Sequence, residues 1–392
     1  MKIFYIDNNP KGRGTYWRCF WLGRSLAKEG HQVTIFCLQN KKTLKISTQV
    51  IDKVKVISLP RFANYGLREL PGHLYRATYV FFKSITSSID VFHTFNVASL
   101  TCGLPVPPLW FLKKIRLVKF KIVVDWDDLW GKEGLTHLNK QGIITENIAD
   151  FLETKIPLLA DKVTVASNEL KKRALRSGVE PKNIIKIING SAADVIKTAR
   201  KNDARKKLNI PLNEKIVCFA GTITINLRMI LASFELACKK LNNLRMFVLA
   251  PLKPEVELLI KGSKVSNKIH SLGILPYEDY LLHLAASDLI LLPRSKHILD
   301  RCEFPSRLGD IMALGKPTLT NRSGDAWKLV IESKAGLVAK VEDDKDFAKE
   351  MIKILTDDNL ARRLAKNARS AAEKKYSWDK LSEKLYGEVY SA

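Results

Sequence analysis

The sequence predicts an α/β protein built from two doubly wound parallel-sheet domains. Its 392 residues are enough for two domains of ordinary size, each with its own core. Short apolar runs alternate with helical patterns from Lys2 onward, and the alternation restarts at Lys215. In both halves glycine follows the first apolar run, at Gly12 and at Gly221. This pattern is typical of a strand that leads through a close-approach loop into a helix.

The first domain is predicted to open with the strand Lys2–Asp7, a loop, and the helix Trp17–Glu29. The loop contains Gly12 and Gly14, whose backbone can approach a ligand closely. It is not a dinucleotide fingerprint, because it has no third glycine and no acidic residue ends the second strand. Later strands are predicted at Gln32–Leu38, Val54–Leu59, Ile89–Phe95 and Lys121–Trp130.

The last of these strands ends in Asp125, Asp127 and Asp128. Clustered carboxylates repel one another unless a cation, a hydrogen bond or a raised pKa offsets the repulsion. Such groups often lie at functional sites, so Asp127 is a candidate site residue. Three aspartates could also hold a metal ion, but we expect no metal here.

A second candidate site lies in the stretch Glu303–Pro317, which predicts a helix over Arg307–Leu314. Pro305 suits the start of this helix, and the Gly-Lys-Pro run suits its end. A helix N-terminus attracts phosphate, and Arg307 adds a forked cationic donor. Asp310, one turn on, can accept hydrogen bonds from the paired hydroxyls of a sugar. An ordinary amphipathic helix with a solvated salt bridge would show the same pattern.

This stretch resembles the nucleotide-sugar motif of the glycosyltransferase family 4 (group 1) enzymes, which are retaining transferases of the GT-B fold. The pattern P-x-K/R-x-x-E-Y-M-A-x-G-x-P is matched with Asp310 in place of Glu and Ile311 in place of Tyr. The other form of the motif has two glutamates separated by seven residues. It is not met, because Cys302 takes the first position and Glu303 lies one place off. The resemblance covers nearly the whole chain and is weakest between Lys41 and Ser88.

The resemblance implies three parts of the chain. Residues 1–195 would form an N-terminal Rossmann-like domain on the acceptor side. Residues 196–376 would form a C-terminal Rossmann-like domain that binds the nucleotide sugar, with the basic run Lys197–Lys207 as the linker and the lead into this domain. Residues 377–392 would form a terminal helix that packs on the N-terminal domain.

The resemblance also implies roles for particular residues. Arg228, Arg307 and the helix start near Pro305 would stabilise the charge of a leaving diphosphate, and Asp127 would contact the donor sugar or the acceptor. Backbone groups of Ile274 and Leu275 would meet the nucleobase. The other residues expected at the donor site are Gly12, Gly14, Gly221, Glu303 and Asp310, the last on the ribose hydroxyls.

The implied activity is transfer of a sugar from a nucleotide-diphosphate sugar to a lipid-linked or glycan acceptor, with retention of anomeric configuration. We expect no cofactor and no metal. A catalytically inactive sugar-nucleotide-binding or scaffold protein of the same fold is the alternative, because Asp310 replaces Glu and no His precedes Asp128. A glycogen-type synthase would need the two-glutamate motif, and an epimerase of the same fold is a further alternative.

The net charge of +25 predicts an anionic partner. Nucleic acid is the weaker choice, because no recognition-helix, RNA-binding-sheet or zinc-finger signature accompanies the charge. Basic and aromatic residues interleave at Leu74–Lys83 and Leu109–Lys121. Such stretches suit an anionic membrane surface, where each cation contributes roughly 1 kcal/mol. Half-buried helices with snorkelling lysines are the alternative.

Six scattered cysteines show no metal-ligand spacing, so they are interpreted as buried, reduced thiols. The chain starts directly in a strand without a signal sequence, and no apolar run is long enough to span a bilayer. We therefore expect a cytoplasmic protein that is peripheral at the inner face of the cell membrane.

Overall fold

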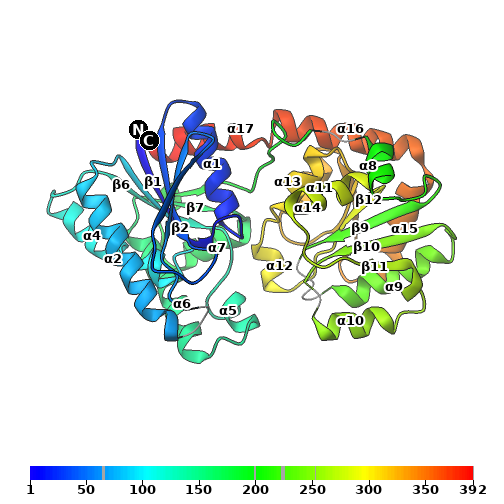
Figure 1. Ribbon diagram of the computed structural model, residues 1–392, viewed down its shortest axis with the longest axis horizontal. Coiled ribbons are helices and arrows are strands. Elements are labelled where there is room, and N and C mark those ends of the chain that lie inside the picture. Colours follow the sequence, from blue (N-terminus) through cyan, green and yellow to red (C-terminus); the bar gives the residue numbers. More distant parts are fainter. Residues whose placement is uncertain (64–66, 198–199, 222–225, 252, 392) are drawn as a thin grey trace. The chain divides into compact units, whose positions relative to one another are not determined.

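The computed structural model describes residues 1–63, 67–197, 200–221, 226–251 and 253–391. The chain divides into two compact units (Figure 1). The first unit comprises Met1–Asn189, Cys302–Phe304 and Trp378–Ala392, and the second comprises Gly190–Arg301 and Pro305–Ser377. The predicted domain boundary, after residue 195, lies a few residues beyond the boundary after Asn189 in the structure.

The first unit contains one sheet in the order β3-β4-β2-β1-β5-β6-β7-β8. All neighbouring strands run parallel except β3 and β4, which are antiparallel. The strands are β1 (Lys2–Pro10), β2 (Gln32–Leu38), β3 (Ser47–Ile51), β4 (Val54–Leu59), β5 (Val91–Phe95), β6 (Lys121–Trp126), β7 (Lys162–Val165) and β8 (Ile184–Lys186).

Helices cover both faces of this sheet, because its central strands are apolar on both sides. Phe4, Phe92 and Ile122 on one face pack with side chains of α2, α3, α4 and α6. Tyr5 and Val33 on the other face lie close to Gly23 of α1. The helices are α1 (Tyr16–Lys28), α2 (Leu70–Thr86), α3 (Leu100–Gly103), α4 (Val106–Lys114), α5 (Leu135–Leu138), α6 (Ile143–Lys155), α7 (Asn168–Arg176) and α17 (Trp378–Leu385).

The C-terminal segment packs on the first unit, beside α1 (Figure 1). Ser25 Oγ of α1 donates to Asp379 at 2.6 Å, and Ser382 Oγ donates to the carbonyl of Leu22 at 3.2 Å. A π-helical turn, Tyr386–Tyr390, follows α17. The hydroxyl of Tyr390 donates to that of Tyr5 at 2.9 Å inside the unit. The last residues therefore complete the core of the first unit.

The second unit contains a wholly parallel sheet in the order β11-β10-β9-β12-β13-β14. The chain starts in the middle at β9, moves two strands one way, and then crosses to the other side, which is the doubly wound arrangement. The strands are β9 (Lys215–Ala220), β10 (Leu244–Leu249), β11 (Ile269–Ser271), β12 (Leu289–Leu292), β13 (Thr318–Asn321) and β14 (Gly336–Ala339).

On one face of this sheet, Val217, Met246 and Leu291 pack with α9, α15 and α16. Capping residues in the sequence start two of these helices, since Asp343 and Asp357 accept hydrogen bonds from backbone N–H groups three residues on. The helices are α8 (Lys201–Lys207), α9 (Leu227–Cys238), α10 (Pro254–Lys261), α11 (Tyr277–Ala286), α12 (Ile298–Cys302), α13 (Arg307–Ala313), α14 (Ala326–Glu332), α15 (Asp344–Thr356) and α16 (Asp358–Lys374).

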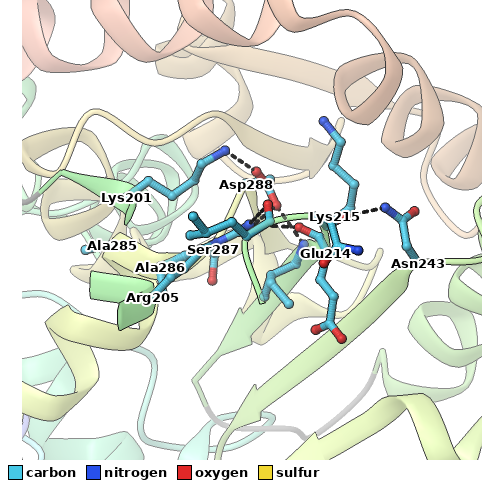
Figure 2. A network of polar contacts seen from close by, with 12 residues as sticks. Lys201, Arg205, Glu214, Lys215, Asn243, Ala285, Ala286, Ser287 and Asp288 are labelled. Carbon is cyan, nitrogen blue, oxygen red and sulfur yellow. Dashed lines mark hydrogen bonds and ion pairs between the residues drawn. The ribbon is translucent and has the colours of Figure 1, made fainter. Parts of the chain in front are cut away.

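The basic run was expected to be the linker and the lead into the second domain. Its residues Lys201–Lys207 form the helix α8 of the second unit, whose polar contacts Figure 2 shows. Arg205 of α8 is buried and donates to Asp288 at 2.7 Å and to the carbonyl of Ala286 at 3.0 Å. Asp288 also accepts from Lys201 at 2.7 Å and from the backbone of Ile216 at 2.7 Å. These contacts lie where β9 and β12 begin and fix α8 to the sheet. Residues 198 and 199 of the run lie outside the described residues.

Two strand predictions need correction. The strand β3 was not predicted, because its side chains are mostly exposed and show no alternation of apolar and polar residues. The predicted strand Lys121–Trp130 ends early, because β6 stops at Trp126 and Asp127 begins a loop. Asp125 therefore lies within the strand rather than at its edge.

Candidate functional site

The second unit places a glycine and an arginine together where its strand order reverses, between β9 and β12. Ligands of open α/β sheets bind beyond the carboxyl ends of the strands at such a point. Gly221 directly follows β9 and has φ +136°, a conformation that favours glycine. A Cβ atom at this position would lie 2.5 Å from Cζ of Arg307. The guanidinium group therefore occupies the space that a side chain would need.

Arg307 is suited to binding an anion. Its Nε atom is buried, and no described residue accepts a hydrogen bond from it. A buried N–H without an acceptor costs about 1–3 kcal/mol, and an anionic oxygen would remove that cost. The helix α13 that begins at Arg307 has only seven residues. The positive charge at this point comes from the side chain more than from a helix dipole.

Asp310, one turn along α13, is held by two tyrosines of α11. Tyr277 Oη donates to Oδ1 at 3.0 Å, and Tyr280 Oη donates to Oδ2 at 3.4 Å. The two phenol rings stack with centroids 5.9 Å apart. Burial raises the pKa of Asp310 to about 7, although both hydrogen bonds act to lower it. Tyr277 is 37% exposed, so one aromatic ring borders the carboxyl group and solvent.

Local sequence explains how α13 is set in place. Gly315 has φ +61° and ends the helix in a Schellman motif, with hydrogen bonds from Gly315 to Met312 and from Lys316 to Ile311. Gly309 lies against the backbone of Gly190, where a Cβ atom would come within 2.9 Å of the carbonyl carbon. The predicted helix Arg307–Leu314 is therefore confirmed to within one residue.

A buried cation fixes the loop that follows β12. Arg294 is buried, pairs with Asp300 Oδ1 at 3.4 Å, and donates from its backbone to Asn321 at 3.0 Å. Ser295 donates to Oδ2 of the same aspartate from its backbone at 2.8 Å and from its hydroxyl at 2.6 Å. In the sequence this segment is recognisable only as basic.

The remaining residues predicted for the donor site are more dispersed. Arg228 is exposed in the first turn of α9 and forms no ion pair with a described residue, and residues 222–225 of the predicted loop lie outside the described residues. Ile274 is 78% exposed and Leu275 is half-buried in the loop before α11. Pro305 is buried in the second unit, whereas Glu303 belongs to the first unit.

The first unit holds Gly12, Gly14 and Asp127. Both glycines have positive φ, at +82° and +53°, in the loop between β1 and α1. Asp127 is buried in the loop after β6, and its Oδ2 accepts from Thr15 Oγ1 of the first loop at 2.8 Å. Burial and the charge of Asp125 raise the pKa of Asp127 to about 6, whereas Arg18 lowers it.

A buried ion pair that was not predicted from the sequence lies next to this loop. Arg18 Nε and Nη2 each donate to a different oxygen of Asp125 at 2.9 Å, and Nη1 donates to Asn189 Oδ1 at 3.0 Å. Both members of the pair are almost fully buried. Arg18 therefore supplies the cation that the aspartate cluster requires. The only signal in the sequence is an arginine on the otherwise apolar face of the first helix.

Glu153 of α6 holds the backbone of the loop after β6. It accepts from Trp126 Nε1 at 2.7 Å and from the backbone N–H groups of Trp130 and Gly131, both at 2.9 Å. Burial raises the pKa of Glu153 to about 7. Asp127 thus lies on a loop that is held by hydrogen bonds to Thr15 on one side and to Glu153 on the other.

Three general expectations, which concern the cysteines, metal ligands and membrane-spanning helices, can be compared with the structure. All six thiols are buried, and none forms a disulfide with a described residue. Within the described ranges, no three His, Cys, Asp or Glu side chains are grouped as metal ligands, and no helix is long and apolar enough to cross a membrane.

The sequence of the second unit matches a known family. Residues 200–371 match the family described as Glycosyl transferases group 1. The chain is 23% identical over 236 residues to an uncharacterized glycosyltransferase of Methanocaldococcus jannaschii, covering 59% of this chain and 58% of that protein. It is 22% identical over 264 residues to the capsular polysaccharide biosynthesis glycosyltransferase CapM of Staphylococcus aureus, covering 60% and 64%. The chain thus spans about three-fifths of the length of these curated relatives.

Solved structures identify the fold. Sucrose-phosphate synthase from Thermosynechococcus elongatus has a TM-score of 0.74 and 18% identity, covering 98% of this chain and 97% of that one. HepE from Anabaena, solved in complex with UDP and glucose, has a TM-score of 0.72 and 16% identity, with both chains covered completely. The predicted GT-B fold of two parallel-sheet α/β domains is therefore confirmed. The group 1 part of the resemblance is supported as well.

Proposed function

We propose that this protein is a retaining glycosyltransferase of family 4 that moves a sugar from a nucleotide-diphosphate sugar to a lipid-linked or glycan acceptor. One observation carries the proposal. The guanidinium group of Arg307, whose Nε atom is buried, lies against Gly221 at the point where the strand order of the second sheet reverses. A diphosphate bound there would contact the forked guanidinium group of Arg307 next to the backbone of Gly221.

The same geometry supplies a mechanism. Departure of the nucleoside diphosphate builds negative charge on its oxygens, and Arg307 stabilises that charge. A fixed donor of this kind lowers a barrier by about 3–4 kcal/mol. Asp310 and the hydroxyl of Tyr277 lie beside it and hold the ribose. With retention, the leaving phosphate accepts the proton of the attacking hydroxyl, so neither a metal nor a second catalytic carboxylate takes part.

Names of related proteins support this donor and product class. HepE was solved in complex with UDP and glucose, and CapM is named as a glycosyltransferase of capsular polysaccharide biosynthesis. These names favour a nucleotide sugar as the donor here and a cell-envelope glycan as the product. They leave the sugar and the base of this protein's donor to experiment.

Thermal unfolding with UDP, GDP, ADP, CMP and their sugars tests the donor class. A ligand at 100 times its dissociation constant stabilises the native state by roughly 2.7 kcal/mol. We expect one base to raise the melting temperature of the wild type and to raise that of Arg307→Gln much less. No shift with any of these ligands would contradict the proposal.

We also propose that the protein binds the inner face of the cell membrane through the outer side of α2, α4 and α6. These helices pack on one face of the first sheet. The side chains that they and the turn after α4 expose include Leu74, Phe82, Phe111, Leu117, Ile144 and Phe151. Asp90 is the only acidic residue between Leu70 and Lys121, a stretch that includes Lys83, Lys113, Lys114, Arg116 and Lys119.

Cosedimentation with vesicles tests the membrane proposal. We expect binding to vesicles that contain phosphatidylglycerol and little binding to pure phosphatidylcholine. Phe111→Ser combined with Leu117→Ser should weaken binding about tenfold or more, whereas Leu212→Ser, which alters an exposed leucine of the second unit, should not. Equal binding to both lipids, or no effect of the paired substitution, would contradict it.

A further inference from the structure

A single carboxyl group, that of Asp300 in α12, joins the connections that follow β9 and β12. Its Oδ2 atom accepts hydrogen bonds from the backbone N–H of Ser295 at 2.8 Å, from the Ser295 hydroxyl at 2.6 Å and from Asn226 Nδ2 at 3.0 Å. Its Oδ1 atom pairs with Arg294 at 3.4 Å, and Asp300 is only 8% exposed. Arg294 and Ser295 follow β12, whereas Asn226 lies at the start of α9, the helix after β9. The strand order reverses between β9 and β12, so Asp300 links the two connections that border the usual ligand position of such a sheet.

The bond from Asn226 is unusual for a residue at the start of a helix. An asparagine at this position usually accepts a hydrogen bond from a backbone N–H of the first turn. Asn226 forms no such bond, and its amide nitrogen donates to Asp300. The amide nitrogen is the donor because a carboxylate that pairs with an arginine offers only acceptor atoms. The side chain of Asn226 therefore fixes the start of α9 to the loop after β12 and does not cap the helix.

The start of α9 carries the cation that is expected on the donor diphosphate. Arg228 lies in the first turn of α9, two residues after Asn226, and its side chain is exposed. The other described end of the β9–α9 connection is Gly221, which donates from its backbone to the carbonyl of Leu249 at 2.9 Å and lies against Arg307. Both described ends of the connection are therefore held by contacts outside it, and the contact made by Asn226 is the one next to Arg228.

The loop after β13 packs on the same group of residues. Ser323 Oγ donates to the carbonyl of Ser295 at 2.5 Å. Gly324 has φ +65°, and a Cβ atom there would lie 2.8 Å from the carbonyl oxygen of Asp300. A buried ion pair by itself is weak evidence for a role in stability, because the cost of desolvation offsets the attraction. The position of Asp300 where three loops meet favours a role in holding side chains of the site in place.

We propose that Asp300 is a positioning residue for the donor diphosphate and acts through Asn226 on Arg228. The inference rests on the proposed function, in which the diphosphate lies beside Arg307 and Gly221. An exposed arginine has many rotamers, and movement of its backbone would bring its guanidinium group within reach of a phosphate still less often. The bond from Asn226 fixes this backbone before the ligand arrives, so less freedom is lost on binding.

Calorimetric titration of the full chain with inorganic pyrophosphate tests the inference, because this probe carries the diphosphate without a base or a sugar. Asn226→Ala should weaken binding about five- to tenfold. Asp300→Asn should weaken it at least as much, because it also removes the counter-charge of Arg294. Asn367→Ala is the matched control and should bind as the wild type does. Asn367 is another half-buried asparagine of the second unit, and its side chain donates to the carbonyl of Lys334 at 3.1 Å.

The variant Arg228→Gln separates positioning from a general loss of structure. Alone it should weaken pyrophosphate binding about tenfold. In this background Asn226→Ala should cause no further weakening, because the group that Asn226 positions is gone. Urea unfolding should show that Asn226→Ala lowers stability equally in both backgrounds, since the bond to Asp300 is lost in each. A merely structural role would weaken binding by the same factor in both.

With a wild type that binds pyrophosphate, two results would overturn the inference: wild-type affinity in Asn226→Ala, or equal weakening by Asn226→Ala in both backgrounds. Asn226→Ala leaves the ion pair of Asp300 and Arg294 intact, so the test stands if Asp300→Asn fails to fold. Pyrophosphate binding that survives Asn226→Ala contradicts this inference alone. A wild type that binds neither pyrophosphate nor any nucleoside diphosphate contradicts the proposed function, and the inference falls with it.

Discussion

The guanidinium group of Arg307 lies against the Cα atom of Gly221, so close that a Cβ atom there would come within 2.5 Å of Cζ. The two residues are far apart in sequence and come from different elements of the second unit. One buried N–H of Arg307, that of Nε, has no acceptor in the described chain. The donor site that we propose depends on this contact.

Gly221→Ala should weaken nucleotide binding at least tenfold while the protein remains folded. The added methyl group displaces the guanidinium, and φ of +136° is strained for alanine. Isothermal titration with the nucleotide that stabilises the wild type measures the loss. The matched control is Gly262→Ala, because Gly262 has negative φ and no contact below 3.3 Å. Equal affinity in Gly221→Ala and wild type would show that Arg307 does not need this position.

Arg307→Gln should reduce nucleotide affinity more than Arg307→Lys does, because lysine keeps the charge but loses the fork. We expect a loss of about 2 kcal/mol or more for glutamine, as for one hydrogen bond to a charged group. The same titration measures it. Arg363→Gln, which alters an exposed arginine of the same unit, serves as the control. Similar losses in the Arg307→Gln and Arg363→Gln proteins would indicate only a general effect of charge.

Tyr277→Phe should keep the stack on Tyr280 and remove the hydroxyl that donates to Asp310. If the hydroxyl helps hold the ribose, affinity for a nucleotide falls about five- to tenfold, as expected for one hydrogen bond. Tyr277→Leu also removes the aromatic surface and should cost more. Tyr386→Phe, at an equally exposed tyrosine of the first unit, is the control. An unchanged Kd in Tyr277→Leu would exclude this tyrosine from the site.

Asp125→Asn should destabilise the protein by about 3–5 kcal/mol, because it leaves the buried Arg18 without its counter-charge. Asp52→Asn removes the partner of Arg24 in an exposed pair and should cost less than about 1 kcal/mol. Urea unfolding of both variants measures the difference. Comparable small losses would mean that the backbone carbonyls around Arg18 suffice to hold it.

Stability should fall as the pH rises from 5 to 8. Burial raises the pKa of Glu153 to about 7, above its value in the unfolded chain. The native state therefore holds a proton that the unfolded state has already lost, and this contribution is full below pH 4.5 and disappears as the pH passes 7. Each unit of pKa shift corresponds to about 1.4 kcal/mol. Asp7 and Asp310 act in the same direction.

Urea unfolding at pH 5 and pH 8 checks this prediction. Glu153→Gln should lose less stability between the two pH values than the wild type, because one titrating group is gone. Glu278→Gln, at an exposed position of α11, should behave as the wild type. Stability that rises with pH in the wild type would contradict the proposed role of the buried carboxyl groups.

The spacing of apolar residues predicted those strands and helices whose formation depends on local sequence. The alternation of strands and helices, the helix from Arg307 and its end at Gly315 follow from apolar spacing and turn chemistry. The strand β3 was missed because its exposed side chains have no buried face to reveal it. The helix α8 was missed because it is charged on almost every side, and only its contact with Asp288 explains it.

The site was predictable only in part, for a related reason. Arg307, Gly221 and Asp310 belong to motifs that can be recognised in sequence. Their partners, and those of the aspartates of the first unit, come from distant segments: Tyr277 and Tyr280 for Asp310, and Arg18 for Asp125 of β6. Pairings of this kind are set by the sheet order, which no local pattern contains.

The release of nucleoside diphosphate from a panel of nucleotide sugars tests the proposed activity most directly. With an acceptor glycan or lipid extract present, we expect the wild type to release the diphosphate of one base and to form a product whose anomeric configuration, read by NMR, is that of the donor. Arg307→Gln should reduce the rate about 100-fold or more, and Arg363→Gln should not change it. Tight nucleotide binding without release would instead identify an inactive sugar-nucleotide-binding protein.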